Sequence, residues 1–293
     1  AAARGEVGRQ AGQGGFPHSI NAVDGELLAA PITMSAKAGA DEFDFTASAE
    51  VAFGEKAADA ASWTAAQSGK SISAMVEGTI EFDGLMRFSV TLKPAGATSV
   101  TLDGLNIDIP LREEAAAQLI CNTGSFNFRS AYDIRMLPAG EGCVWNSRDM
   151  KPGIQKGDVQ GNFRPIIWLG NDERGLAFHA DNDKGWTPDR ENPAQEIIRS
   201  AKAVTLRLRV ITRPVAVDTA RTFTFMLQPT PTKPLPEGAR SWNRGRQGGA
   251  NACYEAIDCF SGFGLANIKA GVRASDFTGQ DPGYNSFRME PQD

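Results

Sequence analysis

The segment FRPIIWLGNDERGLAFHADNDKGW, residues 163–186, decides the fold. It contains two short apolar runs, IIWL and LAFHA, on either side of a polar stretch, which is typical of a β-hairpin. If residues 171–174 form a four-residue loop, Gly170 faces Gly175 and the neighbouring leucines face each other across the strands. Because successive side chains point to opposite faces of a strand, each face of the hairpin then carries its own set of apolar residues. We therefore expect two antiparallel strands inside a sheet, with both faces covered.

A second hairpin signal lies in residues 72–92, where apolar and polar residues alternate on both sides of an Asp-Gly pair. A two-residue turn at that pair would put Arg87 on the apolar face. A three-residue loop at 83–85 instead pairs Phe82 with Met86 and keeps one face apolar throughout, because a slip of one residue moves a whole strand to the other face. The pattern therefore favours the three-residue loop.

The remaining pattern predicts an all-β protein, an antiparallel β-sandwich with little helix. Alternating segments recur at 100–109, 204–210 and 223–227, and 192–202 is the best candidate for a short helix. The proline-rich segment QPTPTKPLP then reads as a stiff, extended exit from the sheet. The predicted organisation is a flexible N-terminal segment at 1–25, a β-sandwich domain at 26–236 and an irregular C-terminal extension at 237–293.

Composition and charge narrow the function classes. Of the 293 residues, 41% are apolar and 22% are charged, which is ordinary for a soluble globular protein. The 30 basic and 35 acidic residues give a net charge of −5, so we expect no nucleic-acid partner. No apolar run approaches the ~18 residues needed for a membrane span. The start of the sequence lacks a signal peptide and reads as a mature or truncated terminus, from which an export signal could have been removed.

The four cysteines are even in number but sparse. The spacing of Cys253 and Cys259 permits a short disulfide loop, and Cys121 with Cys143 could join two neighbouring strands. The alternative is four small, partly buried thiols. Because the sequence has no CxxC motif, only two histidines and no nucleotide-binding glycine motif, we expect neither a metal site nor a cofactor.

Several tryptophans stand next to carboxylates, a combination that suits carbohydrate. An exposed ring stacks on the C–H groups of a sugar while carboxylates and amides bind its hydroxyls. The candidate carbohydrate-binding residues are Trp168, Trp186, Trp145, Asp172, Asp181 and Asp183. In the alternative interpretation Trp168 covers the second face of the hairpin, Trp186 anchors the loop that follows, and the carboxylates are solvated turn residues.

The order of several motifs resembles a known family. WLGNDERGLAF followed by DNDKGW, with EGTIEFDGLMRFSVTL, GEGCVWNSRD and FTFMLQPTPTKPLP, is similar to bacterial proteins that carry an N-terminal domain like that of glycoside hydrolase family 123. The resemblance covers about residues 70–236. It implies a β-sandwich of an exported, carbohydrate-active protein, extracellular or periplasmic.

The resemblance does not extend to a catalytic centre. Family 123 glycosidases cleave N-acetylgalactosamine-containing glycans by substrate-assisted catalysis, with adjacent Asp and Glu residues in a barrel that follows the sandwich. Such a barrel takes ~200 residues, whereas only residues 237–293 follow the proline-rich exit and they contain no adjacent Asp-Glu pair. We therefore carry over no catalytic residue and expect no hydrolysis by this chain alone.

Three functional hypotheses follow. The first is a non-catalytic sandwich of a glycosidase-like protein that supports or extends glycan binding, with a glycan or a separate catalytic domain as its partner. The alternative is a structural or assembly protein that uses the sandwich for subunit contacts as a homo-oligomer. A third hypothesis makes the sandwich itself a hydrolase or lyase through Asp181 and Asp183.

Overall fold

The computed structural model describes residues 14–22, 25–96, 98–122, 132–149, 162–232, 277–281 and 286–289. The chain divides into two compact units, Ala1–Lys233 and Pro234–Asp293. The described part of the second unit is one antiparallel strand pair, β21 (Phe277–Asp281) with β22 (Ser286–Met289). All the architecture that follows belongs to the first unit.

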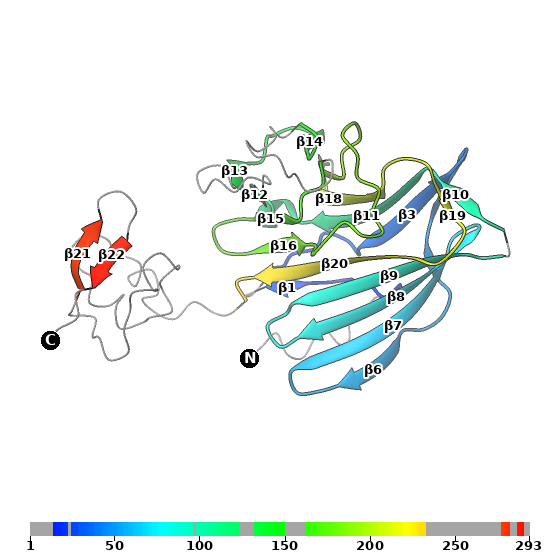
Figure 1. Ribbon diagram of the computed structural model, residues 1–293, viewed down its shortest axis with the longest axis horizontal. Helices are drawn as coiled ribbons and strands as arrows, with labels where there is room; N and C mark the ends of the chain where they lie inside the picture. The colour runs from blue at the N-terminus through cyan, green and yellow to red at the C-terminus, as the bar shows by residue number, and fades with distance from the viewer. Residues whose placement is uncertain are drawn as a thin grey trace. The chain divides into compact units, whose positions relative to one another are not determined.

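The larger sheet of the first unit has ten strands, all joined antiparallel (Figure 1). Its order is β13 (Tyr132–Met136), β12 (Gln118–Asn122), β15 (Ile166–Gly170), β16 (Gly175–His179), β20 (Arg221–Thr230), β9 (Met86–Pro94), β8 (Ile72–Glu81), β7 (Ala60–Ser68) and β5 (Thr46–Ala47), and β6 (Ala52–Lys56) also pairs with β7. The predicted central hairpin thus lies well inside this sheet, as β15 and β16.

The smaller sheet has six strands, in the order β14 (Gly142–Asn146), β17 (Gln195–Arg199), β18 (Val204–Ile211), β11 (Gly104–Leu111), β3 (Thr33–Ala38) and β4 (Asp41–Asp44). Short pairs complete the unit: β1 (Asn21–Ala22) with β2 (Gly25–Glu26), and β10 (Val100–Leu102) with β19 (Val215–Val217). The one helical element of the described ranges is a 3-10 turn, η3 (Glu113–Ala115).

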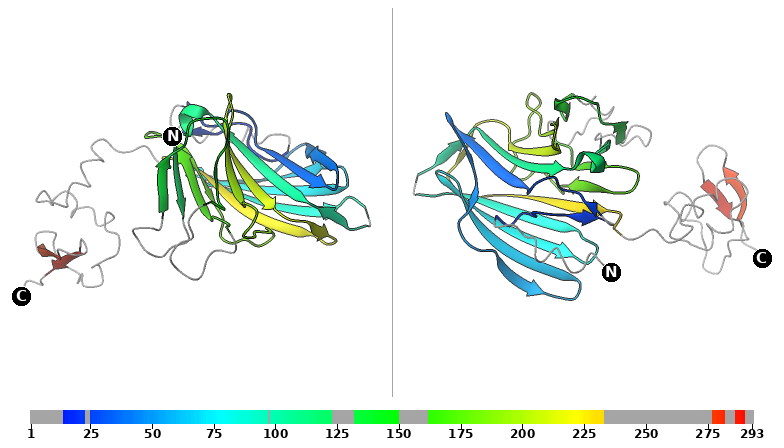
Figure 2. Two further views of the ribbon diagram at one scale, coloured as in Figure 1. Left: turned by 90° about the horizontal axis from the view of Figure 1, so that it is seen from above. Right: turned by 180° about the vertical axis from the view of Figure 1, so that it is seen from behind.

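The core lies between the two sheets, which Figure 2 shows from two further directions. Both sheets turn alternate side chains inward, so their buried apolar residues form one continuous cluster. On β11 every second residue from Leu105 to Leu111 is buried, and β9 does the same from Met86 to Leu92. The predicted all-β, antiparallel sandwich is therefore confirmed.

The core begins earlier in the chain than predicted. Phe16 is buried, and its ring centroid lies 5.6 Å from that of Phe88. Ile20 and Ala22 are buried as well. Residues 14–22 thus belong to the sandwich, which corrects their assignment to a flexible segment, because removing these apolar side chains from water fixes the backbone that carries them.

The β15–β16 hairpin has the predicted register. Gly170 faces Gly175, Leu169 faces Leu176, and the backbone N–H of Asn171 donates to the carbonyl oxygen of Arg174 at 2.8 Å to close the loop. The inward face of both strands is buried. On the outward face Ile166, Trp168 and His179 are partly exposed, and the other residues are buried. This hairpin supplies the framework of the candidate site.

Two local predictions were wrong. The β8–β9 loop has three residues as predicted, but it is centred on Asp83. Ile80 faces Met86, and the Glu81 N–H donates to the Leu85 carbonyl oxygen. The predicted pairing of Phe82 with Met86 is thus two positions out of register, because the left-handed residue that ends a three-residue loop is Gly84, at φ 90°. The predicted helix at 192–202 contains strand β17 instead, since pairing with β14 and β18 on both sides outweighs local helix propensity.

Candidate functional site on the outer face of the large sheet

Trp168 forms a flat aromatic surface on the outer face of the ten-stranded sheet. A Cβ added to Gly170 would lie 2.1 Å from its Cζ2, and one added to Gly175 would lie 2.6 Å from the same atom, so the ring rests directly on these two glycines. The indole Nε1–H donates a 2.8 Å hydrogen bond to Oγ1 of Thr230. Trp168 is half-buried. We call this arrangement the Trp168 platform; it holds one ring in one orientation across β15, β16 and β20.

Polar groups flank the platform on its β12 side. Gln118 faces Gly170 across the strands, which puts its side chain on the same outer face as Trp168. Its Nε2 donates a 2.7 Å hydrogen bond to Oδ1 of Asp172, in the loop that follows β15. Asp172 is exposed. The structure therefore brings together two of the predicted residues, Trp168 and Asp172, and adds Gln118, which the sequence did not single out.

Trp186 is not available to a ligand, which corrects its predicted role. It is 5% exposed, and its ring packs edge-on against Phe163, Phe178 and Phe223 at centroid distances of 5.0, 6.3 and 5.8 Å. Gly185, at φ +84°, turns the chain so that the indole enters the core. The alternative interpretation, an anchor for the loop, describes Trp186 correctly.

Trp145 is also buried, with 6% exposure on β14 of the smaller sheet, so it belongs to the core and not to a binding surface. Asp181 and Asp183 follow β16 at the end opposite to the Asp172 loop. The Asp183 carbonyl oxygen accepts the Trp186 N–H at 2.9 Å, as part of a turn. The six predicted residues therefore do not form one site.

Cys121 and Cys143 are not joined to each other. Cys121 is buried on β12 of the larger sheet, where burial raises the pKa of its thiol to about 12, and Cys143 is exposed on β14 of the smaller sheet. The predicted disulfide between them is wrong, because the sandwich assigns their strands to different sheets. Cys253 and Cys259 lie outside the described residues.

His179 stands on the same outer face, one strand from β20. It faces Ile166 on one side and Met226 on the other. Burial among such neighbours disfavours the charged imidazolium and lowers the pKa of His179 below 6.5. The middle of the outer face thus carries an uncharged imidazole at neutral pH.

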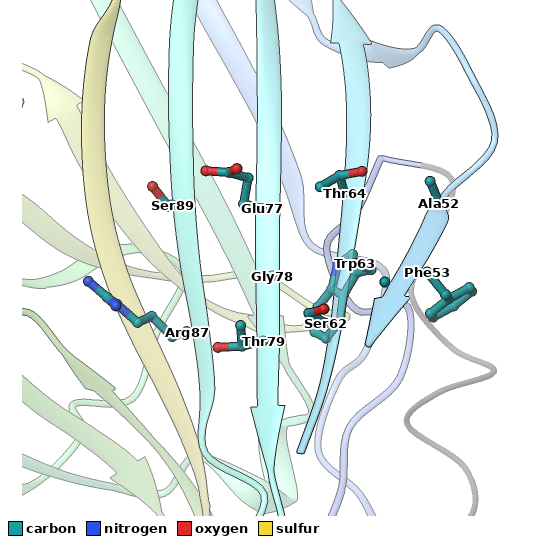
Figure 3. Close-up of a pocket in the computed structure, with 11 residues that line it drawn as sticks. Ala52, Phe53, Ser62, Trp63, Thr64, Glu77, Gly78, Thr79, Arg87 and Ser89 are labelled. Carbon is teal, nitrogen blue, oxygen red and sulfur yellow. The ribbon is translucent and has the colours of Figure 1, made fainter. Parts of the chain in front are cut away.

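Further along this face, over β6 to β9, the sheet is hollowed. Figure 3 shows Glu77, Thr79, Arg87 and Ser89 at this outer-face hollow, whose volume is about 550 Å³. Alternation places the odd-numbered residues of β8 and β9 outward here, with Thr79 opposite Arg87 and Glu77 opposite Ser89. Polar side chains therefore line this part of the outer face.

Two kinds of feature are absent from the described ranges. Within them, no three His, Cys, Asp or Glu side chains gather closely enough to hold a metal ion. Among the same residues, no helix has the length and apolar character needed to cross a membrane.

Comparison with known proteins gives one family match. A family model described as the third domain of glycoside hydrolase 123 matches residues 10–188, more than half of the chain. The match overlaps the 70–236 region of the resemblance, and the description specifies a third domain where the resemblance was to an N-terminal one. A search of curated proteins found no matching relative.

Solved structures with a similar arrangement have low sequence identity. The galactosidase domain of the α-galactosidase–sucrose kinase AgaSK is 10% identical with a TM-score of 0.45, over 68% of this chain and 29% of that one. The α-galactosidase AgaA of Geobacillus stearothermophilus is 11% identical with a TM-score of 0.41, over 69% and 30%. A galactose mutarotase related enzyme of Lactobacillus acidophilus is 9% identical with a TM-score of 0.41, over 77% and 94%. The chain thus spans less than a third of the length of the first two structures.

Proposed function

Because the chain belongs to the family of glycoside hydrolase 123 third domains, we propose that it is a non-catalytic accessory sandwich of a carbohydrate-active protein and that its Trp168 platform contacts a glycan. Its partners would be that glycan and a catalytic domain of the same protein. An extracellular or periplasmic location, where polysaccharides are accessible, fits this role.

The observation that carries the proposal is the fixed ring of Trp168. One side of the indole rests on Gly170 and Gly175, and its only polar group is bonded to Thr230. The opposite side of the ring therefore offers an apolar surface whose orientation is already set, so little side-chain entropy is lost when a sugar stacks on it. Gln118 and Asp172 stand beside the ring, with amide and carboxylate groups that can bind sugar hydroxyls.

The test is a glycan array probed with the full 293-residue chain, followed by calorimetry with the best glycan. Trp168→Ala should weaken binding about tenfold or more, because loss of ~1.5 kcal/mol of stacking corresponds to a factor of ten. Trp168→Phe should lose less, since it keeps a smaller ring. Met75→Ala is the control: Met75 is 44% exposed on β8 and lies outside both the Trp168 platform and the outer-face hollow.

The proposal fails if the folded Trp168→Ala protein binds the glycan as tightly as the wild type. Circular dichroism and thermal unfolding would establish that the variant is folded. It also fails if the wild-type chain binds no glycan on the array.

Subunit assembly is a second candidate, favoured by one observation. Ile134 and Met136 are 70% and 64% exposed on β13, which ends the strand order of the larger sheet. An apolar edge strand can pair with the same strand of a second copy. Sedimentation velocity would show a dimer that Ile134→Ser with Met136→Ser dissociates, whereas a monomer at all concentrations would reject assembly.

A further inference from the structure

We infer that the outer-face hollow over β6 to β9 is a second carbohydrate subsite, specific for an uncharged sugar unit, on the same face as the Trp168 platform. The inference rests on the proposed glycan-binding function and extends it to a site that neither the sequence motifs nor the family match indicates. It follows from the strand register, the side chains that this register turns outward, and their charge balance.

The register builds the hollow from two rows of polar side chains. Thr64, Glu77 and Ser89 lie opposite one another on β7, β8 and β9. Ser62, Thr79 and Arg87 form the next row in the same way. The residues between the rows turn inward: Trp63 is buried, and Gly78 has no side chain, so that the Trp63 ring can lie beneath it.

The outer margin of the hollow is kept open by a glycine. A Cβ added to Gly54 on β6 would lie 2.7 Å from Oγ of Ser62. Any larger residue there would fill the space beside this hydroxyl, so the hollow continues to the last strand of the sheet. Figure 3 shows Ala52 and Phe53 on that strand beside the β7 side chains.

The lining chemistry matches the hydroxyls of a sugar. Four hydroxyl groups can each donate and accept a hydrogen bond, the Glu77 carboxylate accepts from neighbouring hydroxyls, and the Arg87 guanidinium donates to their oxygens. Within the described residues, no ion pair or side-chain hydrogen bond occupies Glu77 or Arg87. Both groups therefore retain their capacity for a ligand.

The charge balance selects the class of sugar. Glu77 and Arg87 are the two ionised side chains of the lining, and their charges cancel. A uronic acid or sulfated unit would be attracted to Arg87 and repelled by Glu77, so it would gain no net attraction to offset the cost of desolvating its own charge. An uncharged hexose unit incurs no such penalty.

The hollow and the platform are separate positions on one face. From β9 to β15 the order is β9, β20, β16 and β15, which is three strand spacings, or roughly 14 Å. A single sugar ring cannot reach both. An oligosaccharide that does should bind more tightly than its fragments, because the second contact then becomes intramolecular.

The experiment uses the full chain on an array of neutral, uronic and sulfated glycans, with calorimetry of the best neutral oligosaccharide. Glu77→Gln combined with Arg87→Gln keeps the shape of the hollow and removes both charges. Because hydrogen bonds to charged groups are lost, affinity should fall about tenfold or more. Lys93→Gln, an exposed change on β9 outside the hollow, is the matched control and should have no effect.

The outcomes separate the two proposals. Loss of neutral-glycan binding in both the hollow variant and Trp168→Ala, with Lys93→Gln unchanged, supports both sites. Loss in Trp168→Ala alone overturns the second subsite and leaves the proposed function standing. A wild-type preference for uronic or sulfated glycans overturns the assigned sugar class. No binding by the wild-type chain overturns both proposals.

Discussion

A single methyl group under the Trp168 ring should displace the platform. In Gly170→Ala the new Cβ would lie 2.1 Å from Cζ2 and 2.3 Å from Cη2 of Trp168. Carbon atoms in contact are ~3.5–4.0 Å apart, so the ring has to move outward by more than 1 Å. Gly170 does not have a positive φ, so an alanine is compatible with its backbone. The effect is therefore on the ring and not on the strand.

The magnitude follows from what the ring loses. The 2.8 Å hydrogen bond to Thr230 breaks when the indole tilts away, at a cost of about 1 kcal/mol, and overpacking of a well-fitted contact costs ~1–3 kcal/mol. Replacing glycine recovers about 0.4–1 kcal/mol through the unfolded chain. Because Trp168 is half-buried and can yield toward solvent, we expect a net loss of about 1–2 kcal/mol. For a domain of this size that lowers Tm by ~2–8 °C.

The assay combines thermal unfolding, 19F NMR of 5-fluorotryptophan and glycan binding. The Trp168 resonance, assigned with Trp168→Phe, should shift in Gly170→Ala, and affinity should fall about tenfold although the tryptophan is still present. Gly104→Ala is the control, since its Cβ would have no neighbour closer than 3.8 Å. Wild-type affinity together with a displaced ring would refute the platform as the binding element. An unshifted resonance would refute the packing argument.

Three further changes test the fold around the site. Gly78→Ala should cost about 3 kcal/mol in urea unfolding, because its Cβ would lie 2.2 Å from the buried Trp63 ring; wild-type stability would contradict this packing. Under native conditions iodoacetamide should modify Cys143 before Cys121, whose pKa of about 12 and burial suppress the thiolate; peptide mass spectrometry showing the reverse order would contradict the assignment. Since burial lowers the pKa of His179, the unfolded chain binds its proton first and stability falls as the pH drops below about 6.5; His179→Gln should lessen the fall in Tm between pH 7.5 and 5.5, and an identical fall would exclude this residue as a source.

The central hairpin could be predicted from sequence because its loop and its register are specified together. The four polar residues 171–174 fix the loop, and Gly170 and Gly175 leave one register that keeps each apolar set on one face. In the β8–β9 hairpin the apolar pattern repeats every two residues, so it tolerates a shift of two. There the backbone conformation of Gly84 decides the loop, and the alternation of side chains carries no information about it.

The tryptophans show that local sequence does not always distinguish a buried ring from an exposed one. Trp186 is buried by Phe163 and Phe223, residues that the fold brings together from distant positions, so no local pattern distinguishes it from an exposed ring. For Trp168 a local signal does exist. Gly170 follows it by two residues on the same face and Gly175 lies opposite Gly170, which leaves a flat area beside the ring. The outer-face hollow needed the strand order as well, because its two rows cross three hairpin-connected strands.

The two glycines under the Trp168 ring also support a role for the platform beyond folding. Glycine in a strand costs roughly 0.5–1 kcal/mol relative to alanine. Here two glycines face each other where β15 ends and β16 begins, next to the hairpin loop. Neither has a positive φ, but a Cβ on Gly175 would lie 2.6 Å from the carbonyl oxygen of Leu169, so only at Gly170 is the Trp168 ring alone the reason for a glycine. The ring that they accommodate remains half-buried and so recovers only part of the stability that a fully buried tryptophan would supply. Glycine at this position weakens the strand and leaves an aromatic ring partly exposed to solvent. Such an arrangement is expected on a surface that binds a ligand.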